Sequence, residues 1–186
     1  MITGSYALSY YTQPRMTRDI DLVIECRGHD ALGIAALFRA DYYVSDEDVA
    51  RALRETGMFN VLHLEAVVKL DFIVRKDSPF RAHEFARRQR VMLPGFEAWM
   101  VGREDLIASK SLEITPSRDT SREFELMVAE RYQRMPPAER VRLAAEMFDT
   151  ARQLVLASFP ADLAPRDVRR LLCRRFYGEL ADQAFA

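Results

Sequence analysis

The fold of this chain is decided by Thr3-Gly4-Ser5 and, after a spacer of thirteen residues, Asp19-Ile20-Asp21-Leu22. The first stretch is a turn of small residues. The second alternates acidic and apolar side chains, which is typical of a strand with one face in a core. Asp19 and Asp21 would then share a face, about 6.6 Å apart along the strand. Two carboxylates that close repel each other, so the pair favours a divalent cation and, with the turn, a metal-bound nucleoside triphosphate.

A third carboxylate lies in the run Val67-Val68-Lys69-Leu70-Asp71-Phe72-Ile73-Val74. This run is β-branched and almost wholly apolar, which predicts a buried strand. Burying a lone ionised carboxylate is costly unless it is paired or binds a metal. We therefore expect Asp71 to lie beside Asp19 and Asp21 on a neighbouring strand. Lys69 falls on the same side of the strand as Asp71, so an ion pair between them is also expected.

Each of these features has a simpler interpretation. A Gly-Ser pair is often only a turn, and an Asp-hydrophobe-Asp triplet is often an edge strand with a solvated face. A single Asp in an apolar strand is often a strand end or the site of a core hydrogen bond. The three features in this order and spacing favour the nucleotide-site interpretation.

The segment from Gly4-Ser5 to Asp19-Ile20-Asp21-Leu22, with Leu70-Asp71-Phe72, resembles the nucleotidyltransferase superfamily related to DNA polymerase β. The nearer subgroup is that of bacterial toxin–antitoxin systems: AbiEii-like toxins, MenA-like toxins and small nucleotidyltransferase antitoxins. Arg15-Met16-Thr17-Arg18 and the stretch from Arg103 to Lys110 support this subgroup. The resemblance covers residues 1 to about 114.

The resemblance implies an enzyme that transfers a nucleoside monophosphate from NTP to a hydroxyl group and releases pyrophosphate. The acceptor would be a tRNA 3′ end or a side chain of a partner protein. One or two Mg²⁺ ions would be the cofactor, and the site residues divide into metal ligands with catalytic roles (Asp19, Asp21, Asp71) and nucleotide contacts (Gly4, Ser5, Arg15, Arg18, Lys110). For Arg18 an ion pair with Asp19, and for Lys110 an ordinary surface position, remain alternatives.

The hydrophobic pattern of residues 1–114 predicts an α/β (α+β) fold, in which a mixed sheet is flanked by helices. Short stretches with strand character alternate along it with helical ones. The predicted strands cover residues 20–25, 42–44, 58–64 and 66–74, with a last hairpin at 91–101, and the predicted helices cover 6–11, 30–40, 46–55, 79–88 and 104–112.

Beyond Thr115-Pro116-Ser117-Arg118 the strand signals end, so we expect an all-helical C-terminal appendage over residues 119–186. Helices are predicted at 119–134, 138–158 and 165–180. Their apolar stripes indicate a core, or an interface with a cognate partner or a second copy. This part resembles small uncharacterised helical bacterial proteins.

Only Met1 and Ile2 precede the turn, so the strand that leads into Gly4 is expected to be two or three residues long. Relatives carry more structure there. The short start favours an alternative function, a non-catalytic interaction protein of nucleotidyltransferase fold whose helical tail binds a partner. A sensor that binds NTP or a divalent cation without turnover is a third interpretation.

Composition sets further bounds. The chain has 186 residues and a net charge of −1, which gives no general indication of a nucleic-acid surface. Its cysteines and histidines lack zinc-site spacing, and no apolar run approaches membrane-spanning length, so a cytoplasmic location is expected. One local basic cluster, formed by Arg81, Arg87, Arg88 and Arg90, predicts either a solvated helix face or a strip for tRNA or triphosphate phosphates.

Overall fold

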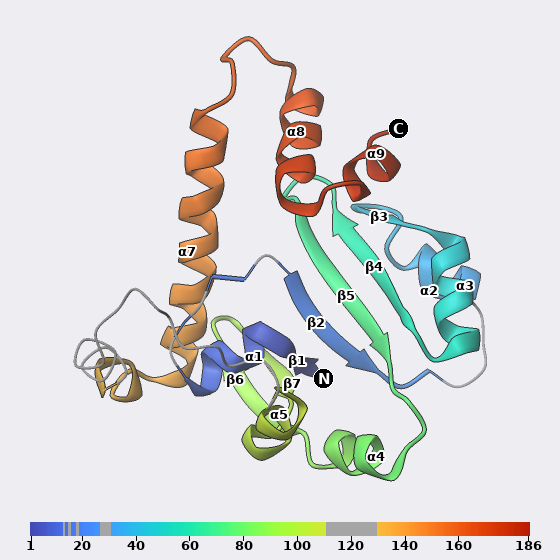
Figure 1. The fold of residues 1–186 in the computed structure, drawn as a ribbon, viewed down its shortest axis with the longest axis vertical. Helices are drawn as coiled ribbons and strands as arrows, with labels where there is room; N and C mark the ends of the chain where they lie inside the picture. The colour runs from blue at the N-terminus through green and yellow to red at the C-terminus, as the bar shows by residue number, and fades with distance from the viewer. Residues whose placement is uncertain (13, 15, 18, 27–30, 111–129) are drawn as a thin grey trace. The chain divides into compact units, whose positions relative to one another are not determined.

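The structure is a computed structural model of the chain, and it describes residues 1–12, 14, 16–17, 19–26, 31–110 and 130–186 (Figure 1). Seven strands form one sheet in the order β3-β4-β5-β2-β1-β7-β6. β1 pairs with β7 in parallel, whereas β3–β4, β4–β5 and β6–β7 are antiparallel. The predicted mixed α/β sheet flanked by helices, with a helical C-terminal part, is therefore confirmed. The strands are β1 (Ile2–Thr3), β2 (Asp19–Ile24), β3 (Tyr42–Val44), β4 (Met58–His63), β5 (Val68–Val74), β6 (Gln89–Leu93) and β7 (Phe96–Met100).

The chain forms two compact units, each built from two separate segments of the sequence. Unit 1 holds residues 1–21 and 77–147, and unit 2 holds residues 22–76 and 148–186. The boundary predicted near residue 115 lies outside the described residues, so the division into domains 1–114 and 119–186 stays a prediction.

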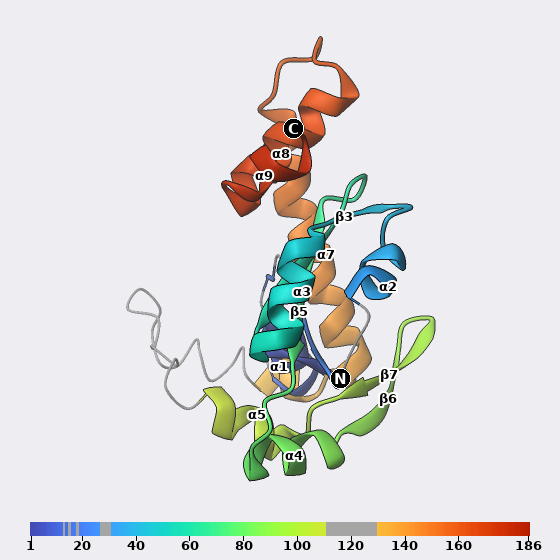
Figure 2. The same ribbon diagram turned by 90° about the vertical axis from the view of Figure 1, so that its right-hand side faces the viewer.

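Unit 1 is built around the short strand β1, the β6–β7 hairpin and three helices. The helices are α1 (Gly4–Tyr11), α4 (Pro79–Ala86) and α5 (Arg103–Lys110). The turn of the hairpin is Pro94-Gly95, and Gly95 has a φ of +90°, which suits glycine. Figure 2 shows this hairpin in green, extending away from α4 and α5. As expected from the sequence, the strand that leads into Gly4 has only two residues.

Unit 2 is built on the β3-β4-β5 meander, with α2 (Ala31–Ala36) and α3 (Asp46–Glu55) packed beside it. The Ser45 hydroxyl accepts the backbone N–H of Asp48 and so caps α3, as the sequence predicts. The Phe59 and Phe72 rings stack in the core at a centroid distance of 5.2 Å. Helix α2 is shorter than predicted, because the chain turns after Ala36.

The C-terminal helices are α7 (Pro137–Ala157), α8 (Pro165–Tyr177) and α9 (Leu180–Ala184). The single helix predicted over 165–180 is wrong: Gly178, with a φ of +59°, ends α8 and separates it from α9. Most of the helix predicted over 119–134 lies outside the described residues. In unit 2, Leu172 of α8 packs into one buried cluster with Leu62 and Val67 near the β4–β5 turn.

Candidate functional site

Gly4 and Asp21, both in unit 1, lie in direct contact. Gly4 opens α1 with a φ of +66°. A Cβ atom added at Gly4 would overlap the Asp21 carboxylate, because it would lie 2.6 Å from Cγ and 3.0 Å from Cβ of Asp21. Only glycine therefore lets the β2 carboxylate lie directly against the first residue of α1.

The first turn of α1 is suited to an anion. Backbone N–H groups at a helix start have no partner within the helix, and the helix dipole favours negative charge there. The N-cap residue Thr3 makes no side-chain capping bond to the described residues. Ser5 lies in this turn and is half-buried. A carboxylate placed beside such a turn can share a cation with a phosphate that the turn holds.

Asp19 lies two residues before Asp21 on β2, and both are half-buried. The Thr17 hydroxyl donates to the Asp19 backbone carbonyl at 2.9 Å and lies 3.4 Å from Asp19 Oδ1. The alternation predicted for β2 places Asp19 and Asp21 on one face of the strand. This face of β2 therefore carries two carboxylates, from residues two positions apart.

Helix α1 is anchored at its other end. The Tyr11 hydroxyl donates to the Val101 carbonyl at 2.8 Å, and burial is the main cause that raises the pKa of Tyr11 to about 12. Arg140 of α7 is buried and donates to the Tyr10 carbonyl from Nε at 3.0 Å and from Nη2 at 2.5 Å. Its Nη1 donates to the carbonyls of Tyr132 and Met135. A cation at the C-terminal end of a helix stabilises it, so α7 helps fix the helix that Gly4 begins.

Asp71 belongs to unit 2, where its buried carboxylate is paired as the sequence predicts. Lys69 Nζ donates to Asp71 Oδ2 at 2.8 Å. Asn60 Nδ2 donates to Asp71 Oδ1 at 2.5 Å. The burial of Asp71 is thus compensated by two groups of the chain, and burial alone no longer argues for a metal. Asp71 as a third metal ligand, and the three-acid cluster with Asp19 and Asp21, stay predictions.

The three predicted cationic contacts cannot be placed in the same way. Arg15 and Arg18 lie outside the described residues. Lys110 is the last residue of α5, and its side chain is not among those described. Their roles as nucleotide contacts therefore stay predictions.

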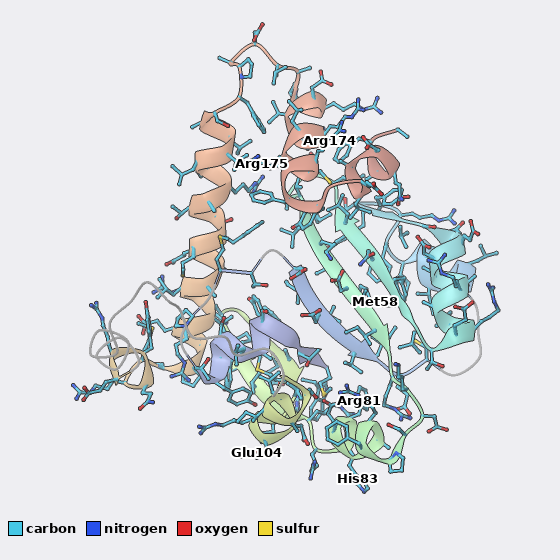
Figure 3. The ribbon with its side chains drawn as sticks, viewed as in Figure 1. Met58, Arg81, His83, Glu104, Arg174 and Arg175 are labelled. Carbon is cyan, nitrogen blue, oxygen red and sulfur yellow. The ribbon has the colours of Figure 1, made fainter. Side chains whose placement is uncertain are left out.

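The arginine cluster does not form one helix face, because α4 ends at Ala86 before Arg87, Arg88 and Arg90. Figure 3 shows Arg81 on α4 and Glu104 on α5. The two helices are joined by the buried Glu84 of α4, which accepts a hydrogen bond from the Ser109 hydroxyl of α5 at 3.0 Å. Three of the four arginines are ion-paired within unit 1, which neutralises most of the predicted phosphate strip: Arg81 with Glu84, Arg87 with Asp105 and Arg90 with Glu97.

The sequence did not predict the contacts of three residues: Asn60 and Tyr177 in unit 2, and Arg140 in unit 1. Asn60 could have been found from strand register, because it lies directly opposite Asp71 in the β4–β5 pair. Arg140 and Tyr177 bind backbone carbonyls more than a hundred residues away in the sequence, and no local sequence pattern predicts such contacts.

Among the residues that the structure describes, no group of three or more His, Cys, Asp or Glu side chains is gathered in a metal-binding arrangement. Comparison of the chain with protein-family models and with curated proteins returned no match. None of the described helices is long and apolar enough to cross a membrane.

Proposed function

We propose that the chain is a Mg²⁺-dependent nucleotidyltransferase that transfers a nucleoside monophosphate from NTP to a hydroxyl acceptor. The observation that carries this proposal is the contact between Gly4 and the Asp21 carboxylate, which brings the start of α1 and an acidic strand to one point. A tRNA end and a side chain of a partner protein are the proposed acceptors, in a toxin–antitoxin setting.

Each residue of the proposed site is given a role from the chemistry of its side chain. The turn at Gly4 and Ser5 would hold the β- and γ-phosphates through backbone N–H groups and the Ser5 hydroxyl. Asp19 and Asp21, and Asp71 as a further ligand, would hold Mg²⁺. Carboxylate oxygens are the protein ligands that this ion prefers, and the glycine that makes room for Asp21 fits such a site. The bound ion would polarise the α-phosphate and neutralise the pyrophosphate leaving group.

In the transfer, the acceptor hydroxyl oxygen forms a bond to the α-phosphorus, and the bond from this phosphorus to the bridging oxygen breaks. Pyrophosphate leaves with the electron pair of the broken bond. The hydroxyl proton passes to a base, for which Asp71 is the proposed residue. Arg15, Arg18 and Lys110 are the proposed cationic contacts of the triphosphate.

The test measures binding and turnover on the full chain. Mg²⁺ with each of the four NTPs is expected to raise the Tm, and Asp21→Asn or Asp19→Asn should abolish the rise. Asp162→Asn, an exposed aspartate of unit 2, is the matched control and should behave as the wild type. Pyrophosphate release is then followed with total tRNA or candidate partner proteins as acceptors. A wild-type chain whose Tm responds to no NTP would refute the proposal.

One observation favours the second candidate, a non-catalytic interaction protein with a partner-binding helical tail. Asp71 is already paired with Lys69 and Asn60, as in a strand whose acid serves the fold. This candidate predicts no pyrophosphate release with any acceptor, whereas a co-purifying partner would be lost on substitution of exposed apolar residues of α7 such as Leu154.

A further inference from the structure

Lys69 holds one oxygen of the Asp71 carboxylate in an ion pair. Its ammonium group lies 2.8 Å from Asp71 Oδ2, and the two side chains are only 18% and 8% exposed. The other oxygen of Asp71 accepts from Asn60. Both carboxylate oxygens therefore have donors from within unit 2.

The C-terminal helix α8 holds Lys69 in this place. The Tyr177 hydroxyl accepts the backbone N–H of Lys69 at 3.3 Å and donates to the Val67 carbonyl at 3.2 Å. Lys69 Nζ lies 6.0 Å from the centre of the Tyr177 ring, at the limit of a cation–π contact. Leu172 of α8 packs in the same buried cluster as Val67, so the position of Tyr177 is fixed by the core.

We propose that Lys69 is a built-in counter-cation that competes with a metal ion for Asp71, and that Tyr177 of α8 sets the strength of this competition. The inference rests on the proposed function, in which Asp71 is a metal ligand. An ammonium and a divalent cation repel each other, so Lys69 must leave Asp71 Oδ2 before a metal binds there. The helical tail thereby regulates the metal site through one side chain.

The direct test is a Mn²⁺ titration of the full chain without nucleotide, in which unbound Mn²⁺ is measured by electron paramagnetic resonance. Lys69→Met is expected to bind Mn²⁺ at least about tenfold more tightly. An opposite charge in contact lowers the proton affinity of a carboxylate by about one to three decades, and a metal ion competes for the same oxygen. Lys76→Met is the matched control: it removes the same charge from an exposed position of the same unit and should bind as the wild type.

Tyr177→Phe tests the part played by α8. Loss of the hydroxyl frees the backbone around Lys69, so Mn²⁺ should bind more tightly than to the wild type, by less than in Lys69→Met. In the Lys69→Met background the same change should add nothing, because the two substitutions act through one group. An equal gain in both backgrounds would show that Tyr177 does not act through Lys69.

A measurement on the unchanged chain covers the case in which Lys69→Met fails to fold. The sequence has only three lysines, so acylation of each amine can be followed by mass spectrometry. Mn²⁺ should speed the acylation of Lys69 and leave that of Lys76 unchanged. Equal Lys69 labelling with and without bound Mn²⁺ would overturn the inference.

The two proposals fail in different ways. Tighter Mn²⁺ binding by Lys69→Met without any pyrophosphate release would support the competition and refute the enzyme. Pyrophosphate release by the wild type, with Lys69→Met binding Mn²⁺ as the wild type does, would support the enzyme and overturn the competition.

Discussion

Replacing Gly4 by alanine tests the contact on which the candidate site depends. Alanine at a φ of +66° costs about 1–2 kcal/mol in left-handed backbone strain. Its methyl group would also overlap the Asp21 carboxylate, since the Cβ position lies 2.6 Å from Asp21 Cγ. Forcing such a group aside costs a further ~1–3 kcal/mol, so we expect a total loss of about 2–5 kcal/mol.

For a chain of this length, each kcal/mol corresponds to about 2–4 °C in Tm, so Gly4→Ala should lower the Tm by roughly 4–20 °C. Differential scanning calorimetry measures this directly. Gly95→Ala is the matched control in the same unit, because Gly95 also has a positive φ but no described atom lies within 4 Å of its Cβ position. It carries the strain alone, so its Tm should fall by only about 2–8 °C.

A second substitution isolates the overlap from the strain. In the Asp21→Ala background no carboxylate meets the new methyl group, so Gly4→Ala should cost no more than Gly95→Ala does. Equal losses for Gly4→Ala and Gly95→Ala in the wild-type background would refute the contact, and with it the argument that α1 and β2 form one site.

Three further predictions concern the surroundings of the site. Asn60→Leu removes one donor from the buried Asp71 carboxylate and should lower the free energy of unfolding by about 1–3 kcal/mol in urea denaturation. Arg140→Met removes the donors to three carbonyls and should cost about 2–4 kcal/mol, whereas Arg142→Met, at a more exposed position of α7, should change stability by less than about 1 kcal/mol. Burial raises the pKa of the Cys173 thiol from 9.0 to about 11, so the unfolded thiol ionises first and stability should fall as the pH rises from 9 to 11. Cys173→Ala should show a smaller fall over that range.

Much of this architecture follows from local sequence signals. Alternation along β2 and β5, the Ser45 cap and the Pro94-Gly95 turn all act within a few residues, and each appears where predicted. The Lys69–Asp71 ion pair followed from the same alternation, because residues two apart on a strand share a face.

The mistakes have equally local causes. The stretch after Ala86 holds good helix formers and no stop signal, so its helix was predicted to continue to Arg88. Pairing of Gln89 with Met100 across the β6–β7 hairpin starts a strand there instead. The apolar spacing that includes Leu180 predicts a continuous helix, whereas Gly178, a residue type common at helix ends, ends α8.

The contacts that local patterns cannot supply are those that tie the helical tail to the rest of each unit. Arg140 reaches the Tyr10 carbonyl across 130 positions, and Tyr177 reaches Val67 across 110. An arginine or tyrosine on an amphipathic helix gives no sign of which distant carbonyl it will meet. Arg140 binds a backbone carbonyl of α1, and Tyr177 binds backbone groups at the start of β5, so the tail helices help to position these two elements.

The structure also changes which acid argues most strongly for a metal. A buried aspartate in an apolar strand suggests a cation because an unpaired charge is costly there, yet for Asp71 that cost is met by Lys69 and Asn60. Asp21 presents a different case, since its carboxylate lies against a glycine in left-handed backbone at a helix start. In the proposed function, both groups would contact a metal-bound triphosphate, whose phosphates suit the start of a helix and whose cation suits a carboxylate.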